Sequence, residues 1–307
     1  MRYTGSVRSS VLRFSSFLVI AAGAIGWPLT ADAFCRSTTC TSDCGVDEHG
    51  CKTKGASLFW RSSCVGISLQ RDASRHIPFD VARKPILSAF GSWSRAPCPG
   101  GEGTLAFAEL APAACHRIEF NEDGPNANVV MFQDDKWVYL AQDNLLAKTT
   151  VTYDPDTGEL LDADVELNHA LNELTVSDTN IVYDVESIMV HEAGHVLGLD
   201  HTDDYQAVMN AQHTAQYEAG RDLADDDLAA VCAVYPPDSA AKCDTTPHGG
   251  FSGDCAADPA VDEGCSAAPA PKPGRGWLAA EWMVALGLVA LGLRRRAICS
   301  TISSCGR

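Results

Sequence analysis

The chain has 307 residues, 46% of them hydrophobic, which suits one domain of good size with additional segments, or two small domains. It carries 40 acidic and 23 basic residues, for a formal net charge of −17. Nucleic-acid binding requires a basic surface, and the acidic composition therefore argues against a nucleic-acid partner. The net charge does not bear on the fold.

The first 33 residues have the three parts of a secretory signal peptide. Arginines precede an apolar stretch from Phe17 to Leu29, and Ala31-Asp32-Ala33 forms an A-x-A cleavage site. We therefore expect residues 1–33 to be removed and the rest to be exported to the extracellular space or the outer cell surface.

The chain has 13 cysteines. In an exported chain, cysteines are expected to form disulfides more often than to bind metals. Residues 34–57 form a short, Cys-dense leader. An even set of ten cysteines, which can pair completely, lies between residues 35 and 255: Cys35, Cys40, Cys44, Cys51, Cys64, Cys98, Cys115, Cys232, Cys243 and Cys255. Among these, Cys98 and Cys115 flank a Gly/Pro-rich loop, which predicts that they pair.

A globular domain is predicted for residues 58–237, and its strands are indicated by alternation of apolar and polar residues. Cys64–Gln70 is the first predicted strand. Arg117–Phe120 and Asn128–Phe132 are two more, separated by a turn at Asp123-Gly124-Pro125.

A strand–turn–strand unit follows, with strands at Thr149–Tyr153 and Leu161–Asn168. The turn holds four residues that calcium-binding loops also use: Asp154, Asp156, Gly158 and Glu159. Two interpretations stay open, a calcium site and a polar hairpin turn, and the turn is favoured because these residue types are common in turns.

Three helices are predicted. The first begins at Pro85, which suits a first turn, and its apolar residues recur at helical spacing as far as Trp93. Asp184 is the expected N-cap of a second helix, which carries histidines. The last helix covers Asp225–Val234 and ends before Tyr235-Pro236-Pro237.

The motif HEAGHVLGLDH, residues 191–201, begins on the second helix. His191 and His195 are one helical turn apart, so both imidazoles project from one face and can reach one metal ion. Gly198 readily adopts the left-handed turn that ends a helix, which lets the chain double back and bring in His201. Three neutral imidazoles with one open position are typical of a catalytic zinc site.

Glu192 follows the first histidine and points beside the metal, where a carboxylate can take a proton from a water molecule. The sequence therefore predicts one catalytic zinc ion on His191, His195 and His201, with Glu192 as the general base.

These residues resemble the metzincin metallopeptidases, whose signature H-E-x-x-H-x-x-G-x-x-H is followed by a methionine turn. Within that clan the chain is similar to the matrixins, because Ala207-Val208-Met209 lies eight residues past His201, as their A-x-M does. The resemblance implies that Met209 forms the apolar floor under the zinc. Leu223–Tyr235 also matches the last helix of matrixins, including its two adjacent acids, Asp226 and Asp227.

The resemblance covers residues 58–237 and implies an α+β fold of the zincin/metzincin type. This fold has a twisted, mostly parallel sheet with an antiparallel edge strand, an active-site helix and a C-terminal helix. Residues 163–168 are where the edge strand that pairs with substrate would lie. The implied activity is hydrolysis of peptide bonds in protein or peptide substrates.

Several residues depart from the matrixin pattern. The histidine- and aspartate-rich loop for a second, structural zinc is missing, so one zinc is expected. Asn210-Ala211 replaces the Tyr-Pro often found after the methionine. Cys44-Gly45-Val46 is similar to the Cys-Gly-Val of the family's latency switch, but Asp43 and Asp47-Glu48 replace its arginine and its Pro-Asp. A disulfide is therefore favoured for Cys44 over a switch.

Beyond the domain, residues 238–276 have the Ala/Pro/Gly-rich composition of a linker. Residues 277–293 form an apolar run, and residues 294–307 begin with three arginines. A membrane-spanning helix needs ~20 apolar residues. The run is therefore predicted as a short transmembrane or sorting helix that anchors the protein at the membrane or cell surface, in preference to a buried soluble helix.

Cys265 precedes this run, and the arrangement resembles the C-terminal surface-sorting signal of myxobacteria, in which the cysteine marks the processing and anchoring point. A plain single-pass anchor is the alternative. For the whole chain the prediction is an exported zinc endopeptidase. A non-catalytic module that keeps the fold for binding, and an aminopeptidase-type enzyme that needs a free substrate amine, are the alternatives.

Overall fold

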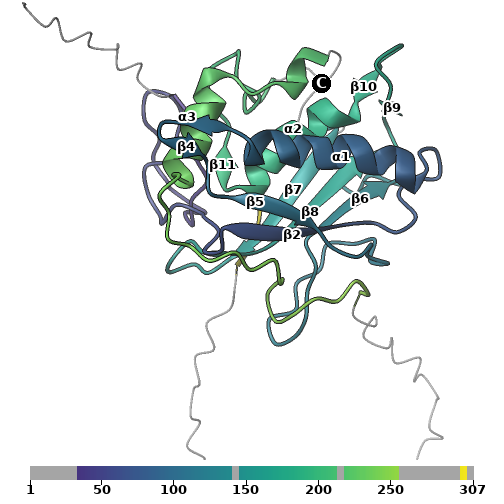
Figure 1. Ribbon diagram of the computed structural model, residues 1–307, viewed down its shortest axis with the longest axis horizontal. Coiled ribbons are helices and arrows are strands. Elements are labelled where there is room, and N and C mark those ends of the chain that lie inside the picture. Colours follow the sequence, from purple (N-terminus) through teal and green to yellow (C-terminus); the bar gives the residue numbers. More distant parts are fainter. Residues whose placement is uncertain (1–32, 140–144, 213–217, 256–297, 303–307) are drawn as a thin grey trace, which may run out of the picture. The chain divides into compact units, whose positions relative to one another are not determined.

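The computed structural model describes residues 33–139, 145–212, 218–255 and 298–302 (Figure 1). Its helices are α1 (Phe79–Ser94), α2 (Val185–Val196) and α3 (Asp225–Val234), with a 3-10 turn, η1, at Glu218–Arg221. The main sheet contains β2 (Cys64–Leu69), β5 (Ala106–Glu109), β6 (Val129–Gln133), β7 (Ala147–Tyr153), β8 (Leu160–Asn168) and β12 (Ile298–Ile302). Short strands pair in twos: β1 (Cys35–Arg36) with β11 (Leu199–Asp200), β3 (Pro97–Cys98) with β4 (Gly101–Glu102), and β9 (Leu174–Thr175) with β10 (Tyr183–Asp184).

The strand order in the main sheet is β12-β7-β8-β6-β2-β5. Strands β5, β2, β6 and β8 are parallel, whereas β7 runs antiparallel to β8, and β12 runs antiparallel to β7. A mostly parallel sheet with an antiparallel strand at one side confirms the predicted α+β fold class.

The predicted position of the substrate-pairing edge is wrong. Residues 163–168 belong to β8, which lies between β6 and β7, so the antiparallel strand beside the four parallel strands is β7. Apolar and polar residues alternate along β8 as they do in a half-exposed edge strand. Its polar face is nevertheless buried, because irregular segments of the chain cover it.

The apolar core fills the space between the sheet and the two long helices, which lie on the same side of it in Figure 1. Ala163, Val165 and Leu167 of β8 face this core. Trp93 of α1 is fully buried, and its indole Nε1 donates to the Val190 carbonyl of α2 at 2.8 Å. Apolar burial and this hydrogen bond together fix α2 against α1.

The first helix begins six residues before the predicted start. Pro78 lies at the N-cap position and Asp80 in the first turn, so Pro85 lies inside the helix. A proline there leaves the Val81 carbonyl without its usual N–H donor. Both prolines precede the same apolar spacing, so the local pattern did not distinguish a start at Pro78 from a start at Pro85.

The predicted strand at Arg117–Phe120 is also wrong, and β5 was not predicted. Residues 117–120 form no strand and instead cross the second face of the sheet, where the Glu119 N–H donates to Asp164 Oδ2 at 3.3 Å. Alternation alone therefore did not distinguish a strand from an extended covering segment.

The second face of the sheet is polar and buried. Asp162, Asp164 and Glu166 of β8 point to it and are at most 4% exposed. Burial raises the pKa of Asp164 to about 8, although the Val129 and Glu119 N–H groups oppose the shift. At neutral pH the Asp164 carboxyl is therefore mostly protonated, which reduces the charge under the cover.

Five disulfides tie the described segments together, and all ten cysteines between residues 35 and 255 pair. The predicted pair of Cys98 with Cys115 is wrong, because their partners lie far along the chain. The pairs are Cys35–Cys51, Cys40–Cys44, Cys64–Cys243, Cys98–Cys232 and Cys115–Cys255. Cys44 is in a disulfide, which was the favoured interpretation.

The turn between β7 and β8 is a polar hairpin turn. Asp154 Oδ1 accepts hydrogen bonds from the N–H groups of Asp156 and Thr157, both at 2.9 Å. Glu159 forms an ion pair with Arg61 through both carboxylate oxygens. These contacts satisfy the carboxylates within the turn, and among the described residues no cluster of three potential metal ligands lies at this turn.

No helix among the described residues is long and apolar enough to cross a membrane. The predicted helix at 277–293, Cys265 and the signal peptide up to residue 32 lie outside the described residues. Their predicted roles stay predictions.

Replacing Trp93 with alanine should lower the free energy of unfolding by ~3–5 kcal/mol, because a large buried side chain is lost and a cavity is left. Denaturant unfolding with the disulfides intact measures this change. Val81→Ala on the same helix is the control, since Val81 is 47% exposed, and it should change stability by no more than ~0.5 kcal/mol. Equal unfolding midpoints for the two variants would contradict the assigned core.

Candidate metal centre

The helix α2 begins at the predicted cap. Asp184 Oδ2 accepts a hydrogen bond from the Ser187 N–H at 2.9 Å, as an N-cap side chain does. Arg221 of η1 binds both oxygens of the same carboxylate, at 2.7 and 2.9 Å. The start of the helix is thus held from a second segment of the chain.

His191 and His195 project from one face of α2, with ring centroids 4.8 Å apart. His191 Nδ1 lies 2.6 Å from the Val208 carbonyl, and His195 Nδ1 lies 3.0 Å from the Leu199 carbonyl. A carbonyl only accepts hydrogen bonds, so each Nδ1 carries a proton, and in the neutral ring Nε2 then keeps its lone pair. This is the tautomer that binds a metal through Nε2.

The third histidine arrives through a tight turn at Gly198, whose φ is +87°. A Cβ there would lie 2.7 Å from the Leu58 carbonyl oxygen, so a side chain would be both strained and obstructed. After the turn, His201 Nε2 lies 3.2 Å from His191 Nε2, and the His195 and His201 ring centroids are 4.9 Å apart.

The three imidazoles fit a bound metal ion. His195 Nε2 is buried and has no hydrogen-bond partner, which is unfavourable for a polar atom unless a ligand completes it. Burial, and then the neighbouring His201, lower the pKa of His195 to about 3, and burial lowers the pKa of His201 as well. The His195 and His201 rings are therefore neutral at physiological pH, which is the form that binds metals.

One other cluster of potential ligands occurs in the described part of the chain, at Cys115, Glu119 and Cys255. Its two cysteines form a disulfide with each other, so they offer no thiolate. Of these two clusters, only the three histidines suit a metal ion.

Glu192 is fully buried beside the histidines. Its Oε2 accepts a hydrogen bond from the Thr149 hydroxyl of β7 at 2.6 Å. The sequence did not predict a role for Thr149, because it lies in an ordinary β-strand pattern and meets Glu192 only in space. The contact sets the direction of the carboxylate and places it next to the edge of β7.

The turn after the third histidine is packed under α2. A Cβ on Gly194 would lie 2.2 Å from Met209 Sδ, so the methionine fills the place of a missing side chain. Asp227 of α3 holds this turn, since its carboxylate accepts from the Val208 and Met209 N–H groups at 2.8 and 3.1 Å. Burial raises the pKa of Asp227 to about 6 against the opposing effect of these donors, so it is ionised at pH 7.

Comparison with known proteins agrees with this geometry. The family profile described as Matrixin matches residues 59–236, more than half of the chain. The chain belongs to the matrixin family. Matrix metalloproteinase-C of Caenorhabditis elegans is 26% identical over 235 residues, which cover 74% of this chain and 37% of that protein. The chain thus corresponds to well under half the length of that relative.

Matrixins are metallopeptidases, and this matrixin has the geometry that such chemistry needs. The structure brings the three predicted histidines together and places Glu192 beside them. It also adds two residues whose roles the sequence did not reveal: Thr149, which contacts Glu192, and Asp227, which holds the turn at Met209. Asp226 and Asp227 matched the family's last helix in sequence, but the contacts that they make required the fold.

Replacing Asp227 with asparagine should lower the free energy of unfolding by ~2–3 kcal/mol, because backbone N–H groups would be buried without acceptors and each costs ~1–3 kcal/mol. Urea denaturation measures the loss. Asp225→Asn changes an exposed acid in the first turn of the same helix and should alter stability by less than ~1 kcal/mol. The assignment fails if the two variants unfold at the same urea concentration.

Proposed function

We propose that this matrixin is an exported zinc endopeptidase that hydrolyses peptide bonds of extracellular proteins. The observation that carries the proposal is the buried, unpartnered Nε2 of His195, which lies among neutral imidazoles and beside a buried carboxylate. The relative named Matrix metalloproteinase-C supports the same class of activity.

His191, His195 and His201 would hold the zinc ion through their Nε2 atoms. When bound, zinc polarises the substrate carbonyl and lowers the pKa of a water molecule toward ~7. The Nδ1 hydrogen bonds to Val208 and Leu199 keep two of the ligand rings in the binding tautomer. The protein therefore supplies a site whose ligand rings are already oriented for the metal.

Glu192 would act as the general base. Its carboxylate takes a proton from the attacking water and then delivers that proton to the leaving amine as the peptide bond breaks. The Thr149 hydroxyl, 2.6 Å from Oε2, donates a hydrogen bond that orients the carboxylate. Proton uptake and release by one carboxylate link the two halves of the reaction.

The substrate would lie extended along β7. An edge strand offers unpaired backbone groups that an extended peptide can pair with. This edge accepts an antiparallel strand, as β12 does along Thr149–Tyr153. Since Thr149 also contacts Glu192, a peptide on this edge runs past the general base.

The main alternative is a non-catalytic module that binds proteins through the same fold. Burying a carboxylate is unfavourable, and binding alone gives no reason to keep Glu192 fully buried beside three imidazoles. An aminopeptidase-type enzyme is the second alternative. It would fail to cleave an N-terminally acetylated protein substrate, whereas an endopeptidase would cleave it.

Export is supported by the disulfides, because five bonds in one chain persist only in an oxidising compartment. The first residue after the predicted cleavage point is docked to the domain, because the Phe34 N–H donates a hydrogen bond to the Asp226 carboxylate. Anchoring through residues 277–293 stays a prediction from the sequence. A membrane span at 277–293 would put residues 298–302 on the opposite side of the membrane from the domain. Such a span and the pairing of β12 with β7 therefore exclude each other.

Replacing Glu192 with alanine should lower kcat/KM for cleavage of an unfolded protein by about 10²–10⁴-fold, because the general base is lost. Metal analysis should still find one zinc per chain, since the three histidines are unchanged. Glu186→Ala, on the first turn of the same helix, is the matched control and should retain activity. Undiminished cleavage by the Glu192 variant would refute the mechanism.

Truncation after Cys255 should lower KM several-fold, because β12 no longer competes with substrate for the edge of β7 and apparent affinity scales with the open fraction. The truncated chain keeps all five disulfides and the five other strands of the sheet. Steady-state kinetics on an acetylated peptide series measures the effect. An unchanged KM would show that β12 does not restrict this edge.

A further inference from the structure

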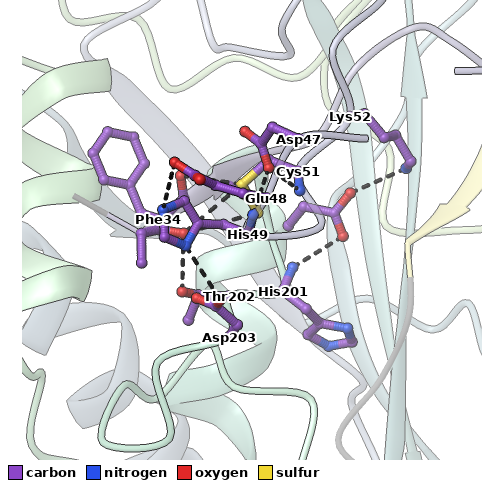
Figure 2. Close-up of a disulfide and its surroundings, with 12 residues drawn as sticks. Phe34, Asp47, Glu48, His49, Cys51, Lys52, His201, Thr202 and Asp203 are labelled. Atoms are coloured by element: carbon purple, nitrogen blue, oxygen red, sulfur yellow. Dashed lines mark hydrogen bonds and ion pairs between the residues drawn. A yellow bond between two sulfur atoms is a disulfide. The ribbon is translucent and has the colours of Figure 1, made fainter. Parts of the chain in front are cut away.

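The leader, residues 34–57, lies directly against the chain that delivers the third histidine (Figure 2). Strand β1 pairs antiparallel with β11, the two residues that immediately precede His201. The Ser37 N–H donates to the Gly198 carbonyl at 2.9 Å, and its hydroxyl donates to the Leu199 carbonyl at 3.1 Å. The turn out of α2 is thus paired with the leader over its whole length.

A charged contact continues from the leader to the histidine itself. Lys52 Nζ lies 3.0 Å from Asp200 Oδ2, and Asp200 Oδ1 accepts a hydrogen bond from the His201 N–H at 2.9 Å. Lys52 is partly exposed, and an exposed ion pair contributes only ~0–1 kcal/mol to stability. The importance of Lys52 therefore lies in the direction that it gives Asp200, rather than in the energy of the pair.

The far side of His201 is held by the same leader. His49 Nδ1 of the leader lies 3.2 Å from Asp203 Oδ2, two residues past His201. Figure 2 shows Phe34, His49 and Lys52 around His201, Thr202 and Asp203. Leader contacts therefore flank the third histidine in both chain directions.

The Cys35–Cys51 disulfide joins these contacts into one unit. Cys35 lies in β1, Cys51 directly precedes Lys52, and Cys35 is 2% exposed. The bond thus connects the strand that pairs with β11 to the lysine that reaches Asp200. The second leader disulfide, Cys40–Cys44, closes a short loop whose hydrogen bonds stay within the leader.

The third histidine needs such support more than the other two. His191 and His195 are fixed relative to each other by one helix. His201 follows a glycine turn and a two-residue strand, so its own secondary structure constrains it least. Residues that orient a metal ligand from outside are typically worth 10–100-fold in metal affinity.

We propose that the leader is a permanent positioning element of the metal site, in which Cys35–Cys51 and Lys52 orient His201 toward His191 and His195. This inference rests on the proposed function, namely that the three histidines bind zinc. It makes the leader part of the active protein, in contrast to an inhibitory segment that activation removes. It also makes metal affinity depend on one particular disulfide.

The test measures zinc dissociation constants by competition with a chromophoric chelator, on the full exported protein without reductant. The double variant Cys35→Ser with Cys51→Ser should bind zinc about 10–100-fold more weakly. The matched control, Cys40→Ser with Cys44→Ser, removes the other leader disulfide and should stay within about twofold of the unmodified protein, because the hydrogen bonds of that loop join it to other leader residues.

A second pair of variants isolates the lysine. Lys52→Met should weaken zinc binding several-fold, and Lys52→Arg should restore it, since arginine keeps a donor to Asp200. Lys54→Met is the control, because Lys54 Nζ donates to the Asp43 carbonyl at 2.7 Å within the leader. This series carries the test if the Cys35/Cys51 variant does not fold.

The outcomes separate the two levels of the proposal. If the unmodified protein binds zinc and cleaves substrate, but the Cys35/Cys51 and Lys52 variants match their controls in zinc affinity, the positioning role is overturned while the proposed function stands. If the unmodified protein binds no zinc, the proposed function fails and the inference falls with it. Weaker zinc binding in both test variants and in neither control supports the positioning role.

Discussion

The geometry of the site depends on two imidazoles, one helical turn apart, whose Nδ1–H groups each donate a hydrogen bond to a backbone carbonyl. Those carbonyls belong to Leu199 and Val208, in the chain that leaves α2. The chain must therefore return close to the helix that it has just left. The left-handed turn at Gly198 and the Asp227 carboxylate under the methionine turn both follow from this requirement.

The same requirement explains how a polar site exists inside an apolar core. Burying imidazoles and a carboxylate is unfavourable unless their polar atoms are partnered. Here His191, His195 and Glu192 have partners from three different segments, and the exception is His195 Nε2. The apolar contact of α1 with α2 keeps those segments in place, so the site depends on the core as well as on its own hydrogen bonds.

Local chemistry allowed the parts of the fold that repeat over a few residues to be predicted from the sequence. The cap at Asp184, the bounds of α3 and the β7–β8 hairpin were predicted correctly because each pattern lies within one segment. The partners of Cys98 and Cys115 are 134 and 140 residues away, and no local pattern encodes them. The predictions for residues 117–120 and for the position of β8 in the sheet were wrong for the same reason, because no local pattern encodes contacts with distant segments.

The buried polar face of the sheet has a consequence for where this sequence can fold. Above the sheet the domain is held by hydrocarbon burial, but below it the cover contributes few apolar side chains and is tied by Cys64–Cys243 and Cys115–Cys255. In a reducing compartment that cover would have little to hold it, and water would reach Asp162 and Asp164. Disulfide formation is thus a condition of the tertiary structure, and this sequence is expected to reach its complete fold only in an oxidising compartment.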